Sequence, residues 1–128
     1  MALKIIFMGT PEFSVPSLKS IIDSGHRVIR VYTQPPKKKS RGQKIHKSPI
    51  HLVADTEGIE VKYPNYLSDE DYNYFLKSKP DLVVVVAYGK LIPKKFLDIH
   101  NLLFINLHAS LLPKWRGAAP IERALLNL

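Results

Sequence analysis

Short apolar runs alternate along this chain with segments whose apolar residues recur at the spacing of an amphipathic helix. The first run, Leu3–Met8, is followed by a glycine and is typical of a buried strand that opens into a turn. The strongest signal, Asp81–Ala87, contains four consecutive valines, as expected of a central parallel strand covered by helices on both faces. Further strands are expected at Arg27–Tyr32, around Val61 and at Leu103–Asn106.

Helices are expected between these strands, because residues typical of helix starts and ends occur at suitable distances. The first helix begins at Ser14 and Pro16 and ends at Gly25, a residue that commonly terminates helices. The next begins at Ser48–Pro49 and closes at Gly58. Two more are expected at Asp69–Ser78 and at Ala118–Asn127.

Strands that alternate with helices in this way predict βαβ units and an α/β fold with a doubly wound, mostly parallel sheet. Ligands of such sheets bind outside the carboxyl ends of the strands, near the point where the strand order reverses. That rule indicates three segments of the chain: Gly9–Phe13, Ala87–Leu91 and Asn106–Gly117.

A nucleotide cofactor is not indicated by the segment after the first strand. It contains one glycine, Gly9, where a dinucleotide-binding fingerprint has three. Pro11 lacks an amide donor, and Glu12 places negative charge where a pyrophosphate would lie. Dehydrogenase and kinase chemistry are therefore not expected.

Length and composition exclude other classes of protein. A chain of 128 residues suits one compact domain. Cysteine is absent, which excludes disulfide frameworks and thiolate chemistry, and the five histidines show no spacing with carboxylates that suits a metal site. The longest apolar stretch, Leu82–Tyr88, is too short to span a bilayer, and the N-terminus lacks the features of a signal peptide. We expect a soluble, intracellular protein without membrane contact.

Positive charge is concentrated in one segment, which we call the basic segment, Lys37–Lys47. It carries six of the positive charges that make up the net charge of +8, which leaves +2 for the other 117 residues. The preceding Pro35–Pro36 and the internal Gly42 indicate an irregular loop. Such a segment either aids solubility or neutralises the phosphates of a nucleic acid, and charge alone does not decide between them.

Asn106 and His108 are the first candidates for chemistry. A buried strand ends at Asn106, and two residues later His108 points to the same side if the chain stays extended. An amide donor and an imidazole placed together could stabilise an oxyanion on an acyl carbon and manage its protons. For the pair by itself a structural role is favoured, in which Asn106 caps the turn and His108 is an ordinary polar residue at a strand end. The apolar Ser110–Pro113 segment that follows favours a ligand slot.

Several motifs in this chain resemble those of the 10-formyltetrahydrofolate-dependent formyltransferases. The segment Asn106–Gly117 looks like the signature of that family. Three further motifs, Gly9–Phe13, Thr33–Pro35 and Val85–Gly89, together with the continuation Arg116–Ile121, resemble the branch that formylates initiator methionyl-tRNA. The resemblance extends along essentially the whole chain.

The resemblance implies a Rossmann-like formyltransferase fold, 10-formyltetrahydrofolate as co-substrate, no metal, and initiator methionyl-tRNA as partner. It implies that Asn106 and His108 are two members of a catalytic Asn-His-Asp trio. It implies that folate is held by Ser110, Leu111, Leu112, Pro113, Val86, Ala87, Tyr88 and Gly89. It implies that tRNA is approached by Arg41 above all, with Lys37, Lys38, Lys39 and Lys44.

One departure from the family pattern concerns the third catalytic residue, because no aspartate follows Asp98. We therefore expect residues 1–128 to be the N-terminal part of the catalytic domain of a longer enzyme that carries a C-terminal tRNA-binding domain. By itself the 128-residue piece is expected to be inactive. The parent is expected to be a monomer in a bacterial cytoplasm or an organelle matrix.

Two kinds of alternative remain open. One is a related enzyme that acts on a small amine, such as a nucleotide sugar or glycinamide ribonucleotide, or that hydrolyses formyltetrahydrofolate. The other is a non-catalytic α/β module that binds nucleic acid. The basic segment favours a tRNA substrate, because a small amine does not need six positive charges.

Overall fold

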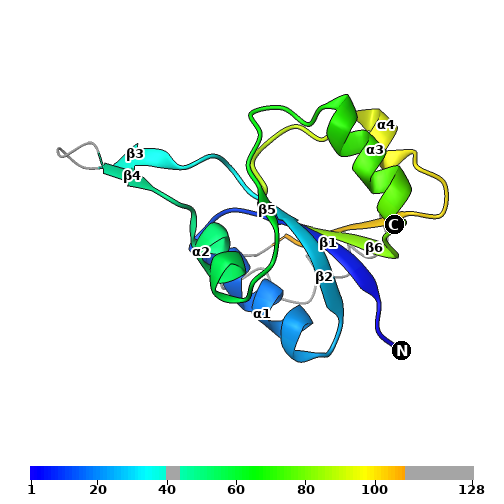
Figure 1. The fold of residues 1–128 in the computed structure, drawn as a ribbon, viewed down its shortest axis with the longest axis horizontal. Coiled ribbons are helices and arrows are strands. Elements are labelled where there is room, and N and C mark those ends of the chain that lie inside the picture. The colour runs from blue at the N-terminus through cyan, green and yellow to red at the C-terminus, as the bar shows by residue number, and fades with distance from the viewer. Residues whose placement is uncertain (40–43, 109–128) are drawn as a thin grey trace, which may run out of the picture.

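Five strands form one parallel sheet at the centre of the molecule (Figure 1). The computed structural model describes residues 1–39 and 44–108. The sheet has the strand order β5-β2-β1-β6-β7, and every pairing in it is parallel. Its strands are β1 (Lys4–Gly9), β2 (Arg27–Tyr32), β5 (Val61–Lys62), β6 (Leu82–Val86) and β7 (Leu103–Asn106). The predicted strands and the doubly wound arrangement are confirmed.

The order of the strands reverses between β1 and β6. From β1 the chain moves outward to β2 and β5, and it then crosses back to the other side of β1 to form β6 and β7. The last residues of the two central strands, Gly9 and Val86, are partners in register. The carboxyl ends of β1 and β6 therefore flank the switch point, where ligands of such sheets bind.

Helices cover both faces of the sheet, as Figure 1 shows, with α1 and α2 on one side and α3 and α4 on the other. Their bounds are η1 (Glu12–Ser14), α1 (Val15–Asp23), α2 (Pro49–Thr56), α3 (Asp69–Ser78) and α4 (Lys94–Leu97). The helices expected after Ser14, after Ser48 and at Asp69–Ser78 are confirmed, whereas Ala118–Asn127 lies outside the described residues. Neither η1 nor α4 was expected, because elements of three and four residues are too short to show helical periodicity. None of the described helices is long and apolar enough to cross a membrane.

Side chains alternate across the sheet and build a core on each face. Along β1, Ile5 and Phe7 belong to one cluster and Ile6 and Met8 to the other, as the two-residue period of a strand requires. The first cluster includes buried residues of α1 and α2: Leu18, Ile50 and Ala54. The second includes buried residues of α3 and α4: Phe75 and Phe96.

Two short strands form within the basic segment, which corrects the prediction of an irregular loop. β3 (Lys37–Lys39) and β4 (Lys44–His46) pair as an antiparallel two-stranded ribbon, which we call the basic ribbon and which projects from the body of the molecule (Figure 1). Pro35–Pro36 precede the first strand, so they remove no hydrogen bond from the ladder. Residues 40–43, which include Arg41, lie outside the described residues.

Candidate functional site

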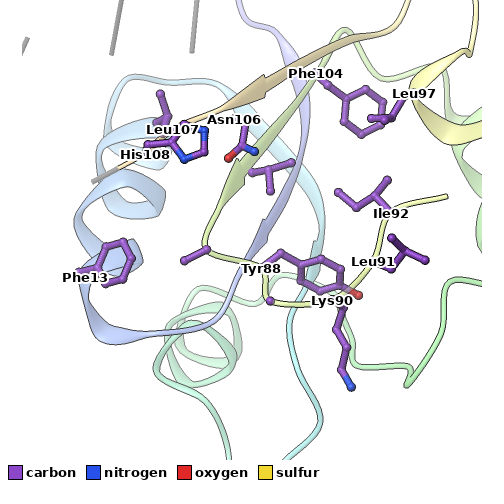
Figure 2. A pocket seen from close by; sticks show the side chains of 13 residues that line it. Phe13, Tyr88, Lys90, Leu91, Ile92, Leu97, Phe104, Asn106, Leu107 and His108 are labelled. Carbon is purple, nitrogen blue, oxygen red and sulfur yellow. The ribbon is translucent and has the colours of Figure 1, made fainter. Parts of the chain in front are cut away.

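A cavity of about 560 Å³ lies at the carboxyl edge of the sheet, beside the switch point (Figure 2). Its volume is in the range of small-molecule sites, which are mostly apolar with a few convergent polar groups. Apolar side chains from several elements line it: Phe13, Val85, Ala87, Leu91, Ile92, Leu97, Phe104 and Leu107. The remaining lining residues are Tyr88, Gly89, Lys90, Asn106 and His108.

Asn106 and His108 both line this cavity. Asn106 is the last residue of β7 and pairs with Val85 of β6. The amide of Leu107 donates a hydrogen bond of 2.8 Å to the carbonyl of Val85, which holds the chain against β6 for one residue beyond the strand. Asn106 and His108 are both exposed, and Figure 2 shows them on the same side of the cavity. The structure thus brings the amide and the imidazole to one space accessible to a ligand.

The facing side of the cavity is the turn after β6, Ala87–Leu91, which Figure 2 shows around Tyr88 and Leu91. Its backbone is unusual, because Ala87 has φ +52° and Gly89 has φ +80°. Left-handed backbone at a residue other than glycine is uncommon and persists where the surroundings determine it. Val86, expected with this group, does not line the cavity; its side chain is buried in the core next to α1 and α2.

Tyr88 turns its side chain into the core under the turn. It is 2% exposed, and its hydroxyl has no hydrogen-bond partner among the described residues. Burial, and then the charge of Asp71, raise the pKa of Tyr88 to about 12. The phenol therefore stays neutral and is unsuited to proton transfer at neutral pH.

The ends of β1 and β2 carry a cluster of hydroxyl and amide side chains next to this turn. The hydroxyl of Thr10 donates a hydrogen bond of 2.9 Å to the carbonyl of Tyr88, and Nε2 of Gln34 donates one of 3.2 Å to the same carbonyl. The hydroxyl of Ser14 donates a 2.7 Å bond to the carbonyl of Val86. These bonds hold the carboxyl ends of the central strands together.

Several lining residues were not singled out by the sequence analysis. Phe13, Lys90 and Leu91 fall within the segments that the strand-end rule indicated, but their side chains were not named. Ile92 and Leu97 lie around α4, and Phe104 lies within β7. Nothing in the local pattern marks these apolar residues as cavity residues, because only the packing of α4 beside β7 brings them to the site.

Other residues proposed from the sequence lie away from this cavity or outside the described part of the chain. Ser110, Leu111, Leu112 and Pro113 lie outside it, as does Arg41. Lys37, Lys38 and Lys44 are exposed on the basic ribbon, and Lys39 ends β3. None of the ribbon residues lines the cavity. Within residues 1–39 and 44–108, no three His, Asp or Glu side chains are grouped so as to hold a metal ion.

The profile of the family described as formyl transferase matches residues 3–127. The chain therefore belongs to the formyl transferase family. Among curated proteins it is similar to the methionyl-tRNA formyltransferases of Pelagibacter ubique, with 55% identity over 130 residues, and of Coxiella burnetii, with 51% over 127 residues. These matches cover 100% and 98% of this chain but only 42% and 40% of the relatives. The chain thus spans about two fifths of the length of those proteins.

Solved structures with the same fold include phosphoribosylglycinamide formyltransferases. Those from Bacillus halodurans and Anaplasma phagocytophilum have TM-scores of 0.57 and 0.58 at 19% and 20% identity. The two alignments cover 97% and 99% of this chain, and 65% and 59% of the chains of those structures. At such low identity, the likeness establishes the fold alone.

Proposed function

We propose that the protein to which this chain belongs transfers a formyl group from 10-formyltetrahydrofolate to the α-amine of methionine on initiator tRNA. The observation that carries the proposal is the placement of Asn106 and His108 opposite the Ala87–Leu91 turn in one cavity at the switch point. The identity of 46–55% to methionyl-tRNA formyltransferases supports this choice of acceptor.

Asn106 and His108 are the proposed catalytic residues. When the amine attacks the formyl carbon, the carbonyl oxygen becomes negative in the tetrahedral intermediate. The side-chain amide of Asn106 and a ring N–H of His108 are suited to donate hydrogen bonds to that oxygen, and such donors act on charge that exists only as the reaction proceeds. The intermediate collapses when its bond to N10 of the folate breaks; the attacking nitrogen loses one proton and N10 gains one, so the products are the formylated amine and tetrahydrofolate.

The folate is proposed to lie against the Ala87–Leu91 turn. Ala87, Tyr88 and Gly89 present backbone beside apolar side chains there, a combination that suits a flat, partly polar ring. Val86, the last residue of β6, is proposed to contribute only through its backbone, which leads into the turn. Ser110, Leu111, Leu112 and Pro113 complete the proposed folate-binding set.

The basic ribbon is proposed to bind the acceptor end of the tRNA. Its exposed lysines, Lys37, Lys38 and Lys44, are suited to neutralise phosphates. Lys39 and Arg41 belong to the same proposed set. We further propose that the enzyme acts as a monomer in a bacterial cytoplasm or an organelle matrix, which sedimentation and cell fractionation would test.

Steady-state kinetics of the protein as its gene encodes it test the catalytic assignment. Asn106→Ala and His108→Ala are expected to lower kcat by about 10²–10³-fold with little change in KM, as for loss of an oxyanion donor. Asn73→Ala and His100→Ala remove the same two residue types at exposed positions elsewhere and should leave kcat unchanged. A kcat of His108→Ala within a few-fold of the unmodified enzyme would contradict the assignment.

The acceptor is tested separately. Initiator methionyl-tRNA and glycinamide ribonucleotide are each supplied with labelled 10-formyltetrahydrofolate, and the formylated product is measured. Formylation of the tRNA alone is expected. Formylation of the small amine alone, or release of formate without any acceptor, would replace the proposed reaction by one of its relatives.

A further inference from the structure

One backbone carbonyl, that of Tyr88, is held from two different strand ends. Thr10 follows β1 and Gln34 follows β2, and both side chains donate to this oxygen, at 2.9 and 3.2 Å. The backbone amide of Gln34 also donates a 3.2 Å bond to the hydroxyl of Thr10. The three residues thus form a closed hydrogen-bonded triangle. Neither Thr10 nor Gln34 lines the cavity, so both act on it only through the turn.

The same cluster holds both roots of the basic ribbon. Gln34 stands three residues before β3, and Ser48 two residues after β4. The hydroxyls of Thr33 and Ser48 lie 2.6 Å apart, and Thr33 Oγ1 lies 3.5 Å from Thr10 Oγ1, at the outer limit of a hydrogen bond. Thr33 and Ser48 are buried, so this contact is shielded from water. A displacement of the ribbon roots therefore acts directly on the groups that hold the turn.

Gln34 also fills the space in front of Gly89. A Cβ added to Gly89 would lie 2.0 Å from Nε2 of Gln34, so the glutamine side chain rests on the bare backbone of the turn. Ala87, two residues earlier, is not a glycine and has positive φ, a conformation that depends on its surroundings. The shape of this side of the cavity thus depends on where Gln34 is placed.

We propose that Thr10 and Gln34 are positioning residues that couple the basic ribbon to the cavity, so that RNA bound to the ribbon raises the affinity of the cavity for folate. The inference rests on the proposed function, because it takes folate and tRNA as the two ligands. The coupling is reciprocal: folate raises the affinity for RNA by the same factor. The arrangement would favour folate binding when an acceptor is present.

The test is a linkage measurement on the protein as its gene encodes it. Binding of tetrahydrofolate, which carries no formyl group to transfer, is titrated with and without a saturating RNA hairpin of the initiator acceptor stem. The unmodified protein is expected to bind tetrahydrofolate about tenfold more tightly with the hairpin, within the usual range of coupling between sites. The hairpin is titrated in turn with and without tetrahydrofolate, and the two factors should agree.

The variants Thr10→Val and Gln34→Leu each remove one donor to Tyr88 at nearly constant volume. In each, the coupling factor is expected to fall to within about twofold of one, while Thr10→Ser retains the hydroxyl and the coupling. Thr56→Val is the matched control, because the hydroxyl of Thr56 donates to the carbonyl of Leu52 on the exposed side of α2. A purely structural role would lower the melting temperature and leave the coupling factor intact.

The outcomes separate the two proposals. A coupling factor of one in the unmodified protein, with both ligands bound, overturns the coupling alone, as does a factor that persists in Thr10→Val and Gln34→Leu. Failure of the unmodified protein to bind tetrahydrofolate overturns the proposed function and the coupling with it. Loss of the coupling factor in both variants, but not in Thr10→Ser or Thr56→Val, supports the inference.

Discussion

Two buried tyrosines on the same face of the sheet have opposite hydrogen-bonding environments. Tyr32 and Tyr88 belong to one core cluster. The hydroxyl of Tyr32 donates a 2.9 Å bond to Asp71 and accepts a 3.1 Å bond from Arg30, whereas that of Tyr88 has no partner among the described residues. A buried polar group without a partner has lost its bonds to water without replacement. The two phenols therefore contribute to stability with opposite signs.

Tyr88→Phe is accordingly expected to raise the free energy of unfolding by about 1 kcal/mol, because it removes an unpaired hydroxyl and keeps the ring. Tyr32→Phe is the matched comparison and should lower it by about 1–3 kcal/mol, because Arg30 and Asp71 each lose one buried hydrogen bond. Urea unfolding monitored by circular dichroism measures both. A destabilised Tyr88→Phe variant would show that its hydroxyl has a partner after all.

At the scale of elements, α2 carries a histidine whose protonation opposes folding. His51 is 5% exposed, its Nδ1 has no partner in the described part of the chain, and its ring lies 5.2 Å from that of Tyr63. Burial lowers the pKa of His51 below 6.5. Asp55, 3.9 Å from Nε2, opposes this shift, and Lys47 adds to it. Folding thus favours the neutral form of the imidazole.

The sign of the resulting pH dependence follows from linkage. The unfolded chain binds the proton more readily than the folded one. The free energy of unfolding therefore carries no penalty from His51 above pH 6.5 and decreases as the pH falls below that value. His51→Phe keeps an aromatic ring against Tyr63 and should flatten the loss of stability on acidification. His100→Gln, at an exposed position, should not. Urea midpoints between about pH 7.5 and 5 give the comparison, and an unchanged slope in His51→Phe would contradict it.

At the scale of the whole molecule, charge is divided between a nearly neutral body and the basic segment, whose two strands form the basic ribbon. Only +2 of the net charge of +8 lies outside the basic segment. The antiparallel register places Lys39 opposite Lys44. Cationic groups held this close to one another repel, and a polyanion relieves the repulsion. Binding of RNA should therefore be strongly dependent on salt.

Each ribbon lysine that contacts a phosphate is expected to contribute about 0.9 to the slope of log K against log salt concentration. The variant Lys37→Gln with Lys44→Gln should thus reduce the slope by about 1.8 and weaken binding similarly for all RNA sequences. Lys19→Gln is the matched control, because it makes the same substitution at an exposed lysine of α1. Fluorescence anisotropy over a range of salt concentrations measures the slopes, and equal slopes for the ribbon and α1 variants would exclude the ribbon as the RNA site.

Local pattern alone determined most of the architecture. The five strands of the central sheet and the three longer described helices follow from hydrophobic period and from residues such as Ser48 and Gly58, because these signals depend on near neighbours in the chain. The candidate site was also accessible in part, since parallel strands bring their carboxyl ends to one edge and place Asn106 and His108 there. The family motifs then indicated which chemistry to consider.

Only the tertiary structure decided how that edge is built. The basic segment forms a ribbon because Lys37–Lys39 and Lys44–His46 pair as antiparallel strands. Its composition, rich in lysine and preceded by two prolines, did not indicate this pairing. Ile92 and Leu97 line the cavity because of how α4 packs. This helix is too short to be predicted from hydrophobic periodicity. Thr10 and Gln34 meet at the carbonyl of Tyr88 although they lie 78 and 54 residues from it. Hydrogen bonds over such separations form only when the sheet is assembled, because its strand order brings their partners together.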